Sequence, residues 1–369
     1  MEFQLYKFNK NIHGLRGLAA TFILILHFLH YFQTLLVDNA LISESSLLIL
    51  NKMASSLSSG VEFFFMISGF LITGSLLRHK NIYNFFIDRA IRIYPVFLAI
   101  HIPFFLIMPF MGWKWLADIS FLEWLGHFIS NALFLPGVFN LPIVQTAAWT
   151  LSYEFLFYLS SGLLFFLSLR ITGLKKYILF TLILLPIFII FPRGLYFLVG
   201  AVIFLLLKNK PTLFENKKFY PTLFFAVLLC IFGPLSYGFE LDRAAIHADE
   251  PYTKIALLPA CFFFIGIVRS QGIISQLLRT KFCQFLGKIS YSMYLWHAVI
   301  LFVFSKGLTS ILLTNLGLPL LIGLVVVVLL FILITLIVSY ISYYLLEDKL
   351  CNILKDHKIK NTRKINVIA

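Results

Sequence analysis

Charge is scarce in this sequence. Only 12% of the 369 residues are charged and 60% are hydrophobic, against about 25% and about 45–50% in an ordinary soluble domain. With 16 acidic and 30 basic side chains, the chain cannot cover a water-exposed globule that carries so many apolar residues. The composition therefore excludes a soluble fold and indicates a protein whose solvent is lipid.

Several familiar signatures are also missing. The sequence has no CxxC pair, no P-loop, no GxGxxG fingerprint and no internal repeat. Its four cysteines lie within or at the ends of apolar stretches, so we expect neither a disulfide framework nor a metal site. A net charge of +14 would suggest nucleic acid only on a soluble body with a basic face, so no nucleic-acid partner is expected.

The sequence contains many long apolar stretches. Crossing a bilayer takes about 20 apolar residues of helix. We therefore predict an all-α fold, a polytopic membrane helical bundle of about ten transmembrane helices. The expected spans are 15–36, 60–77, 93–112, 147–169, 177–192, 194–207, 220–237, 254–269, 285–304 and 317–346. The longest loops between them are 38–59 and 113–146. Residues 1–350 would form one membrane domain, followed by a basic tail at 351–369 that is solvated or touches anionic lipid headgroups.

The basic residues predict the orientation, because Lys and Arg are retained on the cytoplasmic side of a membrane. With the N-terminus inside, 24 of the 30 basic residues fall on the cytoplasmic side and six, among them Arg193, fall outside. One span more or fewer would spoil this sorting. We therefore expect both termini in the cytoplasm.

Several ionisable residues are carried into the predicted spans, where each costs about 2.5–3.5 kcal/mol, and three of them are the main candidates. Arg16 and His27 share the first helix, about 16 Å and three turns apart, and so lie on nearly the same face. Glu154, on the fourth span, is expected at the same depth in the membrane as His27. Its carboxylate would orient the imidazole of His27 as a general base. The alternatives are a snorkelling anchor for Arg16, a packing role for Glu154, and His30 in place of His27.

Two arginines follow the second span. Arg89 and Arg92, with Tyr94 close behind, lie three residues apart and would project from one side of a helix. Paired guanidiniums suit bidentate recognition of phosphate, although a positive-inside stop signal would look the same. Glu62 and His297 are further candidates; for Glu62 a structural role is favoured, and the aromatic neighbours of His297 would also fit a lipid-interface belt.

The ordered motifs resemble one known family. They are His13 to Ala20 followed by His27, Gly60 to Ile72, Arg89 to Pro95, Trp149 to Tyr158, and Leu286 to His297. Together they resemble the acyltransferase-3 family of integral-membrane O-acyltransferases over about residues 10–350. The resemblance implies transfer of an acyl group, usually acetyl from acetyl-CoA, to a hydroxyl of a bacterial surface glycan or its lipid-linked precursor.

The resemblance also implies roles for individual residues. Arg16 and His27 match the family's first-helix pair, Arg89 and Arg92 its cytosolic arginine motif, and Glu154 its helix-four glutamate. Trp149 opens that last motif and is a further candidate. The sequence departs from the family in having Glu62 in place of Asp, Phe155 in place of a second acidic residue, and Glu347-Asp348-Lys349 in place of Glu-x-Pro. The role of Glu347 is therefore open.

One mechanism fits these observations. Acetyl-CoA, the acyl donor, would bind Arg89 and Arg92, and His27 would deprotonate the acceptor or carry the acyl group itself. Arg16 would stabilise an oxyanion or bind a phosphate. Other expected partners are membrane lipids and the sugar acceptor, which would approach past an acidic loop near Glu240; a homo-oligomer is left open. The expected location is the bacterial cytoplasmic membrane.

Three other functions are compatible with parts of this sequence. A polytopic transporter or flippase of lipid-linked glycans would also carry charges into the membrane, but the sequence lacks matching repeats with broken helices. An acyltransferase with another donor or acceptor, and a catalytically silent membrane scaffold, are the remaining alternatives.

Overall fold

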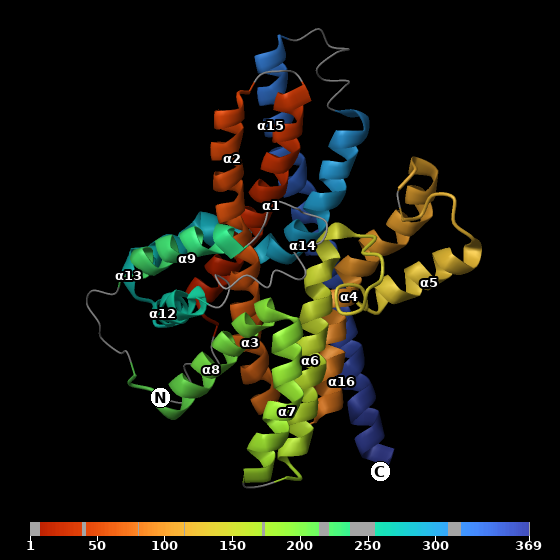
Figure 1. Cartoon of the computed structure of the whole chain (residues 1–369). Coiled ribbons are helices and arrows are strands. Elements are labelled where there is room, and N and C mark those ends of the chain that lie inside the picture. Colours follow the sequence, from red (N-terminus) through yellow and green to blue (C-terminus); the bar gives the residue numbers. More distant parts are fainter. Residues whose placement is uncertain are drawn as a thin grey trace. The chain divides into compact units, whose positions relative to one another are not determined.

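The computed structural model describes residues 8–38, 42–79, 81–113, 115–171, 174–213, 221–236, 255–308 and 319–368. These residues form helices and, apart from one isolated bridge between Pro136 and Phe139, no strand. The all-α prediction is therefore confirmed for the described part of the chain (Figure 1). The acidic loop near Glu240 lies outside the described residues.

The α-helices follow the expected spans with some additions. They are α1 (Lys10–Asp38), α2 (Glu44–Ser56), α3 (Gly60–Arg78), α4 (Ile82–Ile107), α5 (Phe121–Ala132), α6 (Trp149–Ser168), α7 (Leu174–Ile190), α8 (Leu195–Asn209), α9 (Thr222–Ser236), α12 (Leu257–Val268), α13 (Gly272–Leu278), α14 (Lys281–Val303), α15 (Leu320–Ser342) and α16 (Cys351–Ile368). A π-helical stretch, Tyr343–Leu350, joins α15 to α16. Two of the expected loops contain helices, α2 and α5. The predicted tail is also helical, as α16.

Seven of the described helical runs are long and apolar enough to cross a membrane, or eight if the bent pair α12 and α13 is one span. This agrees with a multi-pass membrane protein. The count of ten stays a prediction, because the spans expected at 177–192 and 220–237 correspond to α7 and α9, which have 17 and 15 residues.

The chain divides into two compact units. The first comprises Met1–Ile82 and Thr150–Lys288, and the second comprises Tyr83–Trp149 and Ile289–Ala369. Arg16, His27, Glu62 and Glu154 belong to the first unit. Arg89, Arg92, Tyr94, Trp149 and His297 belong to the second.

The first unit is built around a close crossing of α3 and α8. A Cβ atom at Gly69 would lie 2.0 Å from the carbonyl oxygen of Phe197, and one at Gly200 would lie 1.9 Å from that of Met66. Small residues let helix backbones approach this closely in membranes, where association depends on packing. Phe65 stacks on Phe197 across the same crossing, with ring centroids 4.3 Å apart. The crossing fixes α3, which carries Glu62 and Ser68.

The second unit has its own aromatic core. Phe104 and Phe105 at the end of α4 pack with Met108, Leu116 and Val144. Its helix α5 begins in a capping box, in which Ser120 and Glu123 satisfy each other's backbone N–H groups. These contacts anchor the C-terminal half of α4, the helix that carries Arg89 and Arg92.

Candidate functional site

Glu154 is held by two hydroxyl groups. The hydroxyl of Ser68 on α3 donates to Oε1 of Glu154 at 2.8 Å, and the hydroxyl of Tyr158, one turn along α6, donates a short hydrogen bond to the same oxygen. Hydrogen bonds to a charged group are stronger than those between neutral groups. The half-buried carboxylate is therefore fixed relative to both helices.

The predicted pairing of Glu154 with His27 stays a prediction. Ser68 and Tyr158 supply the hydrogen bonds of Glu154 within the described residues, and His27 is not among these donors. Sequence reasoning missed both hydroxyls. Tyr158 could have been found from its spacing of four residues, which places it beside Glu154 on a helix. Ser68 comes from a helix 86 positions away, and no local signal identifies it.

Arg16 and His27 both lie on α1 and are half-buried. Next to Arg16, the α1 backbone approaches α14 so closely that a Cβ atom at Gly17 would lie 2.4 Å from the backbone nitrogen of Gly287. This contact fixes the N-terminal half of α1 against α14. His30, the competing imidazole, is also half-buried, and its Nδ1 atom has no hydrogen-bond partner in the described part of the chain.

Glu62 forms a buried ion pair that the sequence did not reveal. Nε and Nη2 of Arg193, in the short 3₁₀ turn Pro192–Gly194, each lie 2.9 Å from Oε1 of Glu62. The two side chains are only 4% and 3% exposed, Glu62 and Arg193 respectively. Glu62, for which a structural role was expected, is therefore buried in an ion pair, and the side of the membrane on which Arg193 lies stays a prediction. A charge stays at such a depth when an opposite charge compensates it, and here each residue compensates the other.

The two arginines of α4 have different surroundings. The guanidinium of Arg89 lies over the ring of Phe85, 5.6 Å from its centroid, which suits a cation–π contact. Arg92 is half-buried and makes no hydrogen bond or ion pair to any residue that the structure describes. The hydroxyl of Tyr94 donates to the carbonyl oxygen of Ala132 at 3.1 Å. Arg92 is therefore the side chain of this motif most available to an anionic ligand.

His297 and Glu347 lie in the second unit. His297 is fully buried, and its Nδ1 atom is 3.2 Å from the carbonyl oxygen of Met293. Its neighbour Tyr294 is also buried, so this tyrosine does not belong to a lipid-facing belt. Oε1 of Glu347 accepts hydrogen bonds from both the backbone nitrogen and the hydroxyl of Ser292, at 3.0 and 2.7 Å. The geometry gives Glu347 a role in holding the π-helical stretch against α14.

The remaining candidate, Trp149, begins α6 and is half-buried. In the described ranges, no three side chains of His, Cys, Asp or Glu gather as metal ligands. The candidate residues that the structure describes include an imidazole, His27, a carboxylate held by two hydroxyls, Glu154, and an arginine, Arg92, with no ion pair to the described residues.

Comparison with known proteins shows the family to which the chain belongs. A family model described as "Acyltransferase domain" matches residues 9–344. "Nodulation protein 10" of Rhizobium leguminosarum bv. viciae is 28% identical over 118 residues, covering 28% of this chain and 32% of the relative. The chain thus spans about a third of that relative's length. "O-acetyl transferase" of Shigella phage Sf6 is 25% identical over 263 residues, covering 64% of this chain and 71% of the relative.

No solved structure matches the chain. The family model covers nearly all of the described residues, including α1, α3, α4, α6 and α14 with the motifs that they carry. The chain belongs to the acyltransferase-3 family of membrane proteins.

Proposed function

We propose that this protein is an O-acyltransferase that moves an acetyl or other short acyl group from acyl-CoA to a hydroxyl of a cell-surface glycan or its lipid-linked precursor. The observation that carries the proposal is His27 on a membrane-spanning helix inside the region that matches the family. An ionisable residue within a membrane span is costly and marks a functional site by default. The O-acetyl transferase of Shigella phage Sf6 favours acetyl as the acyl group.

In this proposal His27 is the general base. Its imidazole takes the proton of the acceptor hydroxyl, and the oxygen attacks the thioester carbonyl of the donor. The carbon–sulfur bond of the resulting tetrahedral intermediate then breaks. The coenzyme A thiolate leaves and takes the proton from the imidazolium, so the products are an ester and the free thiol. Acyl transfer through the imidazole itself is the alternative route.

Two charged residues of the same unit assist His27. Glu154, fixed by Ser68 and Tyr158, stabilises the imidazolium that forms during proton transfer. Arg16 stabilises the developing oxyanion or binds a phosphate, because a cation suits either anion. The charge of Glu62 is compensated by Arg193, and we assign Glu62 a structural role.

The donor is recognised by Arg89 and Arg92. Phosphate groups of acyl-CoA match the fork of guanidinium donors, and Arg92 makes no competing ion pair within the described residues. Tyr94 flanks the same site. The ends of the helices that carry most of the Lys and Arg residues would face the cytoplasm, where acyl-CoA is made. The location that follows is the bacterial cytoplasmic membrane.

The proposal is tested with purified full-length protein in nanodiscs. Acetyl-CoA labelled in the acetyl group is incubated with lipid-linked glycan, and label in the glycan is measured. Wild type is expected to transfer label, and the His27→Gln variant, at equal abundance, is expected to transfer none. The same protein is also reconstituted into sealed vesicles. Movement of glycan across the vesicle membrane without transfer of label would favour the transporter alternative and overturn the proposal.

A further inference from the structure

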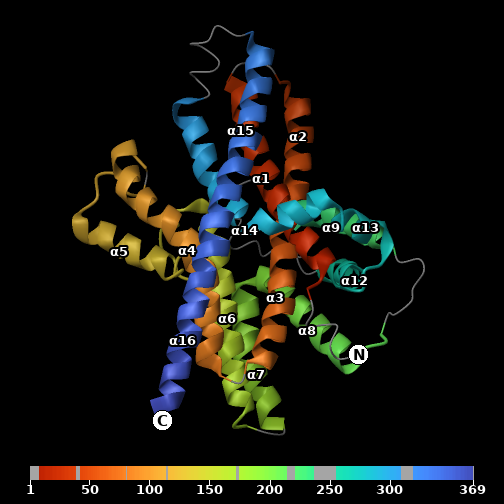
Figure 2. The ribbon, with the colours of Figure 1, turned by 180° about the vertical axis from the view of Figure 1, so that it is seen from behind.

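The C-terminal helix α16 lies along the first half of α4, within the second unit (Figures 1 and 2). The thiol of Cys351 is 3.1 Å from the carbonyl oxygen of Ile91. Seven residues further on, Nζ of Lys358 lies 3.1 Å from the carbonyl oxygen of Asn84. Contacts that advance by seven residues on one helix and go back by seven on the other define an antiparallel pair.

Pro95 explains the first of these contacts. Proline has no backbone N–H, so the carbonyl four residues earlier loses its helical hydrogen bond. In α4 that carbonyl belongs to Ile91, and the thiol of Cys351 lies within hydrogen-bond distance of it and, equally, of the carbonyl oxygen of Leu346 in its own helical run. The carbonyl group that Pro95 leaves without a helical hydrogen bond in α4 is thus a contact point for α16.

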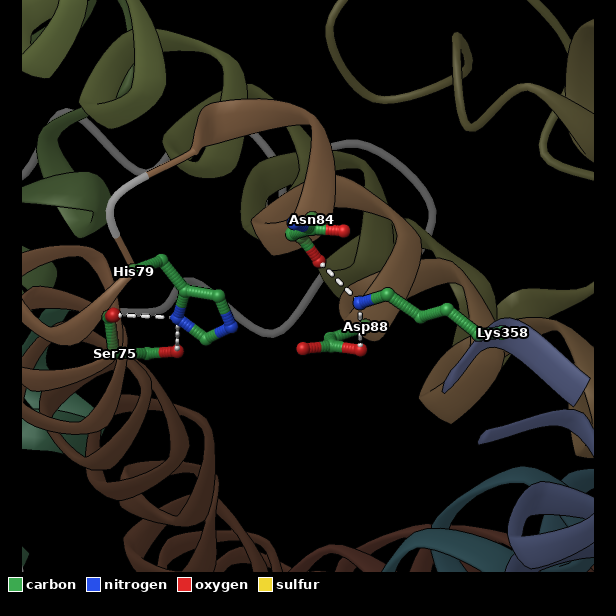
Figure 3. Close-up of polar contacts among 5 residues, drawn as sticks. All are labelled: Ser75, His79, Asn84, Asp88 and Lys358. Carbon is green, nitrogen blue, oxygen red and sulfur yellow. Dashed lines mark hydrogen bonds and ion pairs between the residues drawn. The ribbon is translucent and has the colours of Figure 1, made fainter. Parts of the chain in front are cut away.

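Lys358 makes a second and stronger contact, with a carboxylate. Its Nζ lies 2.7 Å from Oδ1 of Asp88, and the two side chains are 19% and 29% exposed. Figure 3 shows the ammonium group between this carboxylate and the carbonyl of Asn84. Asp88 immediately precedes Arg89, so α16 reaches the arginine motif directly.

The ion pair that Asp88 forms determines whether its carboxylate can also bind Arg92. An acidic residue four positions before an arginine lies beside it on a helix, in the orientation that favours an ion pair. Asp88 and Arg92 have this spacing. In the structure, however, the carboxylate bonds Lys358, and Arg92 has no ion pair among the described residues.

We propose that Lys358 is a positioning residue that holds the carboxylate of Asp88 away from Arg92, so that Arg92 stays available to the phosphate groups of the acyl donor. This inference rests on the proposed function. It concerns a helix outside the family match, which ends at residue 344, whereas α16 begins at Cys351. Without Lys358, Asp88 would occupy Arg92 and compete with the donor.

The test is equilibrium binding of labelled acetyl-CoA to the full-length protein in nanodiscs. The variants are Lys358→Met, Asp88→Asn, the double variant, and Arg92→Gln. The matched control is Lys355→Met, which removes the same charge from an exposed site one turn earlier on α16. Retention on size-exclusion chromatography and the thermal midpoint show whether each variant is folded.

Lys358→Met is expected to weaken acetyl-CoA binding about three- to tenfold, since a charged hydrogen bond to phosphate is lost. The double variant is expected to bind within about twofold of wild type, because it has no carboxylate to capture Arg92. Asp88→Asn and Lys355→Met should also stay within about twofold. A merely structural role for the pair would instead weaken binding in the Asp88→Asn and double variants as well.

The outcomes separate the inference from the proposed function. If Arg92→Gln weakens binding and Lys358→Met does not, the inference is overturned and the donor site stands. If the double variant is as weak as Lys358→Met, competition for Arg92 is also overturned. If wild type does not bind acetyl-CoA, or Arg92→Gln binds as wild type does, the donor site itself is wrong and the inference falls with it.

Discussion

Arg193 and Glu62 form an ion pair 131 positions apart in the sequence, with two guanidinium nitrogens each 2.9 Å from one carboxylate oxygen. The pair ties the turn between α7 and α8 to the start of α3. Because both side chains are buried, removal of one leaves an uncompensated charge.

Arg193→Met should therefore lower the free energy of unfolding by about 3–5 kcal/mol. The double variant Arg193→Met/Glu62→Gln should lose clearly less, because no buried charge remains alone. Reversible unfolding in mixed detergent measures both values. Additive losses from the two single substitutions would contradict the account.

The crossing of α3 and α8 should not tolerate a methyl group. Gly200→Ala would place a Cβ atom 1.9 Å from the carbonyl oxygen of Met66, so the two backbones must separate. We expect a lower thermal midpoint and a lower yield of folded protein. Gly126→Ala on α5 is the matched control, since nothing lies within 4 Å of a Cβ atom there. It should leave stability unchanged or raise it by up to about 1 kcal/mol; equal losses at both sites would show that close packing is not the cause.

The two hydroxyls on Glu154 should matter for catalysis. Ser68→Ala and Tyr158→Phe are each expected to lower kcat about tenfold, the equivalent of one hydrogen bond to a charged group. KM for acyl-CoA should not change, because neither residue belongs to the proposed donor site. Ser160→Ala removes a hydroxyl of α6 that bonds Leu156 rather than Glu154 and should have wild-type kcat. Equal effects of Ser68→Ala and Ser160→Ala would contradict the role given to Glu154.

The start of α5 should be sensitive to acid. Hydrogen bonds from the backbone N–H and hydroxyl of Ser120 lower the pKa of the Glu123 carboxyl below its usual value. A lowered folded-state pKa means that this stabilisation is present above the unfolded pKa and is lost as pH falls through the folded pKa. The protection factor for amide hydrogen exchange in the first turn of α5, which corrects for the fall of the intrinsic exchange rate with pH, should therefore decrease on acidification. In Ser120→Ala this protection factor should already be low at neutral pH. A pH-independent difference between the two proteins would argue against the capping box.

Hydropathy alone predicted the helices on which the candidate residues lie. α1, α3, α4, α6 and α14 each overlap an expected span, because lipid requires long apolar helices with satisfied backbones. The spacing of Arg89 and Arg92 also predicted that both lie on one helix, and both lie on α4. These features are local, so periodicity and motif order were sufficient.

Partners that are distant in the sequence could not be predicted. Arg193 was counted as an outside basic residue because the charge rule considers loops and not buried partners such as Glu62. Ser68 and Lys358 reach Glu154 and Asp88 from other helices, and composition carries no sign of either contact. α2 was expected as a loop because its polar serines lower the hydropathy, yet it forms a helix before α3.

The most direct test of the central claim, that His27 performs acyl transfer, is a mass spectrum of surface glycan from a host that lacks the gene. The host is complemented with wild type, His27→Ala or Arg92→Ala at equal membrane abundance. The account predicts one added acetyl mass per modified sugar with wild type, none with His27→Ala, and a reduced fraction with Arg92→Ala that recovers when acetyl-CoA is raised. Restoration of the modification by His27→Ala would contradict the claim and point to His30 or His297 instead.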